Sequence, residues 1–97
     1  MRRAAKIDAN QSGIVKLAWR IGATVQSLAA VGNGCPDLLL GYRGVNYLVE
    51  VKDGSLARSR RQLNERQESW HQRWSGAVVI IGSDEELMAL LCAKQYD

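Results

Sequence analysis

The stretch that decides the fold is DLLLGY (residues 37–42), RG (43–44) and VNYLVEVK (45–52). Two apolar runs flank the Arg43-Gly44 break, and the second run is rich in the β-branched and aromatic residues that suit a pleated strand. We therefore predict a β-hairpin over residues 37–51 that turns at Arg43-Gly44 and pairs Tyr42 with Val45.

This register places two acidic side chains opposite each other. Asp37 pairs with Glu50, with Cβ atoms about 4.5–5.5 Å apart, and two like charges at that distance need compensation. Alternation places Lys52 on the same face as Glu50. Carboxylate oxygens suit Mg²⁺, and Mn²⁺ is a possible substitute. The alternative is a solvated strand face on which Glu50 and Lys52 form an ordinary ion pair. The residues predicted on the opposite face are Leu38, Leu40, Val45, Tyr47, Val49 and Val51.

The other elements are predicted from apolar spacing. Helices are expected over residues 10–21 and 63–74 and after Ser83, and further strands over residues 24–29 and 77–81. The order helix, three strands, helix, strand, helix predicts an α/β fold with a mixed central sheet. Asp8 with Gln11, and Ser83 with Glu86, resemble capping boxes. The predicted buried helix residues are Ile14, Leu17, Ala18, Ile21, Leu87, Leu90 and Leu91.

One face of the helix at residues 63–74 combines an amide with aromatic residues. Leu63, Gln67, Trp70 and Trp74 recur at steps of four, three and four. The tryptophans are expected to pack in the core or in a dimer contact. A buried amide needs hydrogen bonds, so we predict that Gln67 faces either the carboxylate site or nearby backbone. His71 is predicted to lie off the Gln67 face, in a structural or exposed position.

The composition fits a single domain over residues 1–97. Of the 97 residues 46% are hydrophobic, and 13 Lys and Arg against 10 Asp and Glu give a formal charge of +3, which is compatible with an anionic partner. Cys35 and Cys92 are too few and too far apart for a zinc site or a disulfide framework and are expected to be reduced. No targeting or membrane-spanning segment is recognised, which favours a cytoplasmic protein.

Gly34-Cys35-Pro36-Asp37, followed by Glu50-Val51-Lys52, resembles the signature of the PD-(D/E)XK nuclease superfamily, and the stretches 31–39, 48–54 and 63–70 resemble its VRR-Nuc branch. The resemblance implies a restriction-endonuclease-like core and a metal-dependent DNA phosphodiesterase. In such an enzyme Asp37, Glu50 and the backbone carbonyl of Val51 hold the metal. Lys52 is the catalytic lysine, and Gln67 matches the family's helix glutamine.

At this chain length the resemblance also implies a stand-alone homodimer that cuts branched DNA, such as four-way junctions. Many relatives carry a glutamate on the first helix, where this chain has Gly13, and the nearest acidic residue, Asp8, is more simply a helix cap. The missing carboxylate leaves open a catalytically silent nucleic-acid-binding module. A third possibility is a structural or interaction protein that does not bind nucleic acid.

Basic residues follow the Lys52 strand closely enough to contact a phosphate backbone. The alternative is a solvated basic helix start, which the helix dipole disfavours. The amino-terminal basic residues are either a mobile DNA-binding arm or a segment without a role. Trp19 lies off the main apolar stripe of its helix, so base stacking is open to it, although core packing or a dimer contact is favoured. The predicted phosphate contacts are Arg58, Arg60, Arg61 and Arg66, and the amino-terminal residues are Arg2, Arg3 and Lys6.

Overall fold

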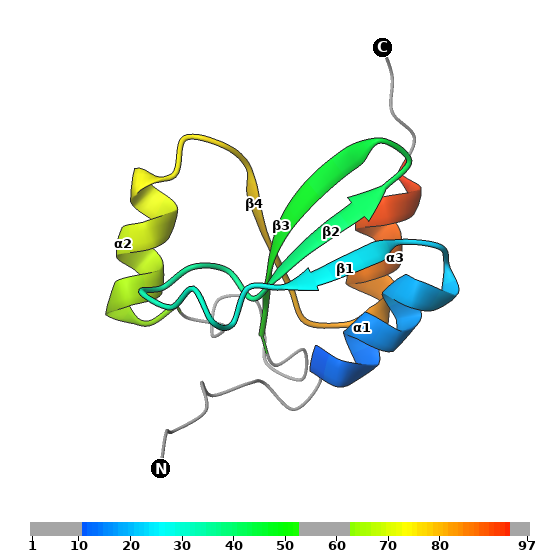
Figure 1. Ribbon diagram of the computed structural model, residues 1–97, viewed down its shortest axis with the longest axis horizontal. Coiled ribbons are helices and arrows are strands. Elements are labelled where there is room, and N and C mark those ends of the chain that lie inside the picture. Colours follow the sequence, from blue (N-terminus) through cyan, green and yellow to red (C-terminus); the bar gives the residue numbers. More distant parts are fainter. Residues whose placement is uncertain (1–10, 53–62, 94–97) are drawn as a thin grey trace.

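The computed structural model describes residues 11–52 and 63–93, which form a small α/β domain with three helices and a four-stranded open sheet (Figure 1). The helices are α1 (Gln11–Arg20), α2 (Glu65–Arg73) and α3 (Asp84–Cys92). The strands are β1 (Thr24–Ser27), β2 (Leu38–Tyr42), β3 (Val45–Val51) and β4 (Val78–Ile81). The predicted order of elements is confirmed, and their ends differ from the predictions by a few residues at most.

The sheet is mixed, as predicted. Its strand order is β1-β2-β3-β4; the first two pairings are antiparallel and β3 runs parallel to β4. The β2–β3 hairpin turns at Arg43 and Gly44, which have φ angles of 50° and 81°, and two positive φ angles in succession match the twist of a two-residue hairpin. Tyr42 pairs with Val45, so the predicted register is confirmed.

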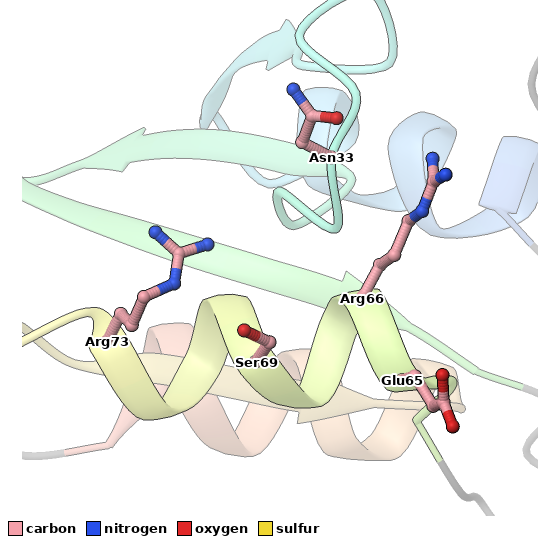
Figure 2. Close-up of a pocket in the computed structure, with 5 residues that line it drawn as sticks. All are labelled: Asn33, Glu65, Arg66, Ser69 and Arg73. Carbon is pink, nitrogen blue, oxygen red and sulfur yellow. The ribbon is translucent and has the colours of Figure 1, made fainter.

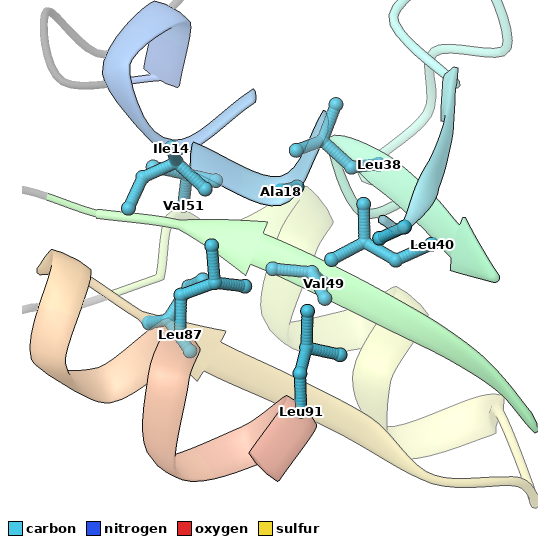
Figure 3. Close-up of a cluster of buried hydrophobic side chains, with 10 residues drawn as sticks. Ile14, Ala18, Leu38, Leu40, Val49, Val51, Leu87 and Leu91 are labelled. Atoms are coloured by element: carbon cyan, nitrogen blue, oxygen red, sulfur yellow. The ribbon is translucent and has the colours of Figure 1, made fainter. Parts of the chain in front are cut away.

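The hydrophobic core lies on one face of the sheet, beneath α1 and α3 (Figures 1 and 3). Alternation along β2 and β3 sends every second side chain to this face. The predicted strand positions contribute as expected, except that Val45 is exposed and Tyr47 is only partly buried at the hairpin end. The labelled core residues in Figure 3 are Ile14 and Ala18 of α1, Leu38, Leu40, Val49 and Val51 of the hairpin, and Leu87 and Leu91 of α3.

Helix α2 lies on the other side of the sheet and has no buried residue (Figure 1). Of the two alternatives predicted for Trp70 and Trp74, packing in the core is therefore wrong, and a dimer contact stays a prediction. Trp70 is half-buried, Trp74 is 48% exposed, and their rings stack on each other with centroids 4.6 Å apart. Periodicity correctly predicted a helix but not how little of its aromatic face is buried.

Of the two hydrogen bonds of the capping box predicted for α3, the one accepted by the Ser83 side chain is confirmed. The Ser83 hydroxyl accepts a hydrogen bond from the Glu86 amide at 3.1 Å, while the Glu86 carboxylate accepts from the Gly82 amide at 2.6 Å instead of reaching back to Ser83. Asp8, the predicted cap of α1, lies outside the described residues. Of the helices in the described ranges, none has the length and apolar content required to cross a membrane.

Candidate active site at the end of the hairpin

Asp37 lies one residue before β2, and the hairpin register extended by one residue sets it opposite Glu50, as predicted. The Asp37 carbonyl accepts a hydrogen bond from the Leu28 amide at 2.8 Å. Its carboxylate oxygen Oδ2 accepts from the Val51 amide at 2.7 Å. These two bonds fix both the backbone and the side chain of Asp37 beside the last residues of β3.

Glu50 is the buried charge of the site. Its side chain lies on the sheet face opposite the hydrophobic core, and the residue is only 1% exposed. A buried carboxylate requires charged or hydrogen-bonding partners. Gln67 supplies one, because its Nε2 donates to Glu50 Oε2 at 3.0 Å, and Lys52 Nζ lies 3.7 Å from the same oxygen. The alternative of a solvated strand face is wrong, since Glu50 is buried and the side chain of Lys52 is only 17% exposed.

Gln67 joins the carboxylate site to α2. Its Oε1 accepts from Lys52 Nζ at 2.9 Å and from the Asn64 backbone amide at 3.0 Å. The Asn64 side chain in turn caps α2 by accepting from the Gln67 amide at 2.9 Å, which completes a capping box. Both alternatives predicted for Gln67, the carboxylate site and nearby backbone, are therefore satisfied by one side chain.

Gly34 allows the loop before Asp37 to touch α2. Its φ of 84° lies in the region that favours glycine. A Cβ atom at this position would lie 2.1 Å from the Arg66 carbonyl oxygen and 2.8 Å from the Gln67 amide nitrogen. The absence of a side chain at Gly34 thus sets how closely the first turn of α2, with Gln67, approaches the carboxylates.

The charges of the site act on two neighbouring groups. Burial raises the pKa of the Cys35 thiol, and the negative charges of Glu50 and Asp37 raise it further. Burial lowers the pKa of His71, and the positive charge of Lys52 lowers it further. The prediction that His71 lies off the Gln67 face is wrong: the two residues are one helical turn apart, and His71 is close enough to Lys52 for its charge to act.

The donor set at this position is small and made of oxygen atoms. In the described ranges no three or more His, Cys, Asp or Glu side chains are grouped so that they hold a metal ion. Asp37 and Glu50 supply two carboxylates at one point of the sheet, and the charges of both reach Cys35. Because Mg²⁺ binds proteins through one or two carboxylates and keeps several waters, this donor set fits Mg²⁺. It does not resemble a closed zinc site.

A pocket of about 350 Å³ lies beside Asp37, which forms part of its wall together with Cys35 and Gln67. Gln11, the first residue of α1, also lines it, although sequence reasoning considered this residue only as half of a capping box. Gln11 is recognised only from the structure, because it is a polar residue that is only 8% exposed. Gly13, the position at which many relatives carry a glutamate, is exposed in contrast to Gln11. Nothing lies within 4 Å of the point where its Cβ atom would be.

A groove between α2 and the loop at Asn33 adjoins this pocket, because Asn33 and Arg66 line both (Figure 2). Figure 2 shows the side chains of Arg66 and Arg73 extending from α2 toward that loop, while Glu65 points away. Arg73 was not among the predicted phosphate contacts. Of those residues, Arg58, Arg60 and Arg61 lie outside the described part of the chain, as do Arg2, Arg3 and Lys6. Trp19 is 60% exposed.

Comparison of the chain with protein-family models, with curated proteins and with solved structures finds no match.

Proposed function

We propose that the chain is a metal-dependent DNA endonuclease of the PD-(D/E)XK superfamily, VRR-Nuc branch, with a restriction-endonuclease-like core. The observation that carries this proposal is the connected cluster at the end of the hairpin. Asp37 is bonded to the Val51 amide, and buried Glu50 and Lys52 are bridged by Gln67. A buried carboxylate that a glutamine bridges to a lysine, with a second carboxylate opposite it in the hairpin, is unusual for a merely structural strand end, because burying charges is costly.

In the proposed reaction Asp37, Glu50 and the Val51 backbone carbonyl would hold Mg²⁺. When bound, the cation would supply Lewis-acid chemistry, activating the attacking water and neutralising charge that develops on the scissile phosphate. Water oxygen bonds to phosphorus as the phosphodiester P–O bond breaks, which yields one phosphate end and one hydroxyl end. Lys52 directs its positive charge at the developing oxyanion or at the attacking water, and Gln67 holds Lys52 in place through the 2.9 Å bond.

The groove along α2 supports DNA as the substrate. Arg66 and Arg73 are seven residues apart, so their Cα atoms are separated by about 10.5 Å along the helix axis. That distance is close to the axial rise of three nucleotides at about 3.4 Å each. Arginines at this spacing fit phosphates about three nucleotides apart on one strand leading into the Asp37 pocket. The Ser69 hydroxyl, between the two arginines in Figure 2, is a further phosphate donor.

A homodimer that acts on branched DNA remains part of the proposal. A two-fold dimer presents two identical sites, which is the arrangement needed to cut two strands of a four-way junction. The support for this step is the resemblance, so the substrate's branching is tested directly.

The second candidate function is a catalytically silent nucleic-acid-binding module. The observation in its favour is the small donor set, with two carboxylates and no acidic residue at Gly13. Such a protein binds DNA through the α2 groove but hydrolyses nothing.

The experiment that separates the two functions is cleavage of labelled junction, flap and duplex DNA with Mg²⁺, Mn²⁺ or EDTA. We expect cleavage with either metal and none with EDTA. Asp37→Asn and Lys52→Ala should each slow cleavage by about 100-fold or more, because each removes a group that acts in the transition state. Asp84→Asn and Lys16→Ala, at exposed positions on α3 and α1, are the matched controls and should cut normally.

Each result bears on a specific part of the proposal. Binding without cleavage in either metal supports the silent module and refutes the enzyme. Unchanged cleavage by Lys52→Ala refutes the role given to Lys52. Equal cleavage of junction and linear duplex refutes structure specificity but not hydrolysis.

The DNA path is tested by binding in EDTA, which is independent of cleavage. Arg73→Gln should weaken duplex binding and reduce the slope of log K against log salt by about 0.9, the effect of one lost phosphate contact. Arg20→Gln removes the same charge at the end of α1, on the other side of the sheet, and should leave the slope unchanged. Equal slopes for the two variants would refute DNA binding in the groove along α2.

A further inference from the structure

Gln11 contains a buried oxygen that nothing in the described structure satisfies. The residue is 8% exposed, and its Oε1 is buried without a hydrogen-bond partner among residues 11–52 and 63–93. A buried amide oxygen without a partner costs free energy, and native proteins retain few such groups. An apolar side chain of similar size at the start of α1 would avoid this cost. The amide therefore calls for a partner that residues 11–52 and 63–93 do not provide.

The position of Gln11 indicates what that partner is. Gln11 lines the same pocket as Asp37 and Gln67, at the point where the first turn of α1 approaches the end of the hairpin. The pocket, at about 350 Å³, is more than ten times the roughly 30 Å³ that one water occupies in the liquid. It has room for a hydrated cation together with part of a substrate phosphate.

The chemistry of the amide oxygen selects among possible ligands. A carbonyl oxygen accepts hydrogen bonds and binds hard cations, and Asn and Gln carbonyls are established ligands of such ions. It does not attract an anion. Beside two carboxylates, a neutral oxygen adds a ligand without adding to the repulsion between Asp37 and Glu50.

We propose that Gln11 contributes its Oε1 to the divalent-cation shell formed with Asp37 and Glu50, as a neutral replacement for the carboxylate that is missing at Gly13. This inference rests on the proposed function, because the cation is the one used for hydrolysis. A neutral ligand holds the cation less tightly than a carboxylate. The affinity of this site is therefore limited by the residue at position 11.

The test measures cation binding without DNA and without turnover. Mn²⁺ affinity is determined by calorimetry for the wild-type chain, Gln11→Leu and Gln11→Glu, and urea unfolding is followed in EDTA. Gln11→Leu should weaken Mn²⁺ binding about 10-fold or more, while its stability in EDTA equals or exceeds that of the wild type. Gln11→Glu should tighten Mn²⁺ binding and lower stability in EDTA, because a second carboxylate then lines the pocket beside Asp37.

The control is Gln26→Leu, at an exposed position on β1, which should bind Mn²⁺ like the wild type. Gln11→Leu with wild-type Mn²⁺ affinity, or Gln11→Glu with no gain, overturns the inference while leaving the nuclease proposal intact. If Gln11→Leu fails to fold, Gln11→Glu alone decides. A wild-type chain that neither binds Mn²⁺ nor cuts DNA refutes the proposed function and the inference together.

Discussion

Replacing Gly34 with alanine tests whether the contact between its loop and α2 assembles the site. The φ of 84° costs a non-glycine residue about 1–2 kcal/mol. The new Cβ would also lie 2.1 Å from the Arg66 carbonyl oxygen, whereas an ordinary contact is about 3.5 Å or more. The loop and the first turn of α2 must therefore separate by about 1 Å or more. A shift of that size at Gln67 breaks its 3.0 Å bond to Glu50 and misplaces Lys52.

The matched control is Gly32→Ala. Gly32 has a φ of 72°, and nothing lies within 4 Å of its Cβ position, so this variant has the same backbone strain without the collision. By urea unfolding, Gly32→Ala should lose about 1–2 kcal/mol and Gly34→Ala about 1–3 kcal/mol more. In the cleavage assay Gly34→Ala should be about 100-fold slower than Gly32→Ala, the usual effect of a 1 Å displacement. Equal stability and equal rates for the two variants would refute the argument that this contact positions α2.

Three further predictions concern single side chains of the site. Asp37→Ala removes the acceptor of the buried Val51 amide and should lower the free energy of unfolding in EDTA by about 1–3 kcal/mol, whereas Asp37→Asn retains an acceptor and should unfold near the wild-type midpoint. Cys35 has a raised pKa, so mass spectrometry should show it alkylated more slowly near neutral pH than exposed Cys92; faster labelling of Cys35 would contradict this. The pKa of His71 is lowered in the fold, so the unfolded chain takes up a proton first as pH falls through about 6.5. The free energy of unfolding should therefore fall from about pH 7 to about pH 5, and His71→Gln should reduce this fall. The same pH dependence in His71→Gln and the wild type would contradict the role given to His71.

The hairpin was the most predictable part of the fold. Alternating apolar residues on both sides of Arg43-Gly44 leave few registers that bury one face. The bounds Val45–Val51 and the opposition of Asp37 and Glu50 follow from that register. The helices α1 and α3 were predictable for a similar reason, because their apolar stripes meet the core face directly.

The environment of α2 was not predictable in the same way. An apolar stripe through Trp70 and Trp74 normally indicates a core-facing helix, but here Gln67 of that stripe is bonded to buried Glu50 and Trp74 remains exposed. Periodicity describes a helix's own surface and not what lies opposite it. The contact at Gly34 and the buried oxygen of Gln11 both depend on how distant segments approach, which no local pattern encodes.

The way α2 is attached has a consequence for the site. No residue of the helix is fully buried, and the Gln67 bridge and the close approach at Gly34 both hold it in position. Elements with few buried apolar contacts open at lower free energy than the core. Gln67 also completes the cap of its own helix, so a shift of α2 disturbs the cap, the Lys52 contact and the Glu50 contact together. A DNA strand bound by Arg66 and Arg73 would hold α2 against the loop, and substrate binding would thereby complete the arrangement that hydrolysis requires.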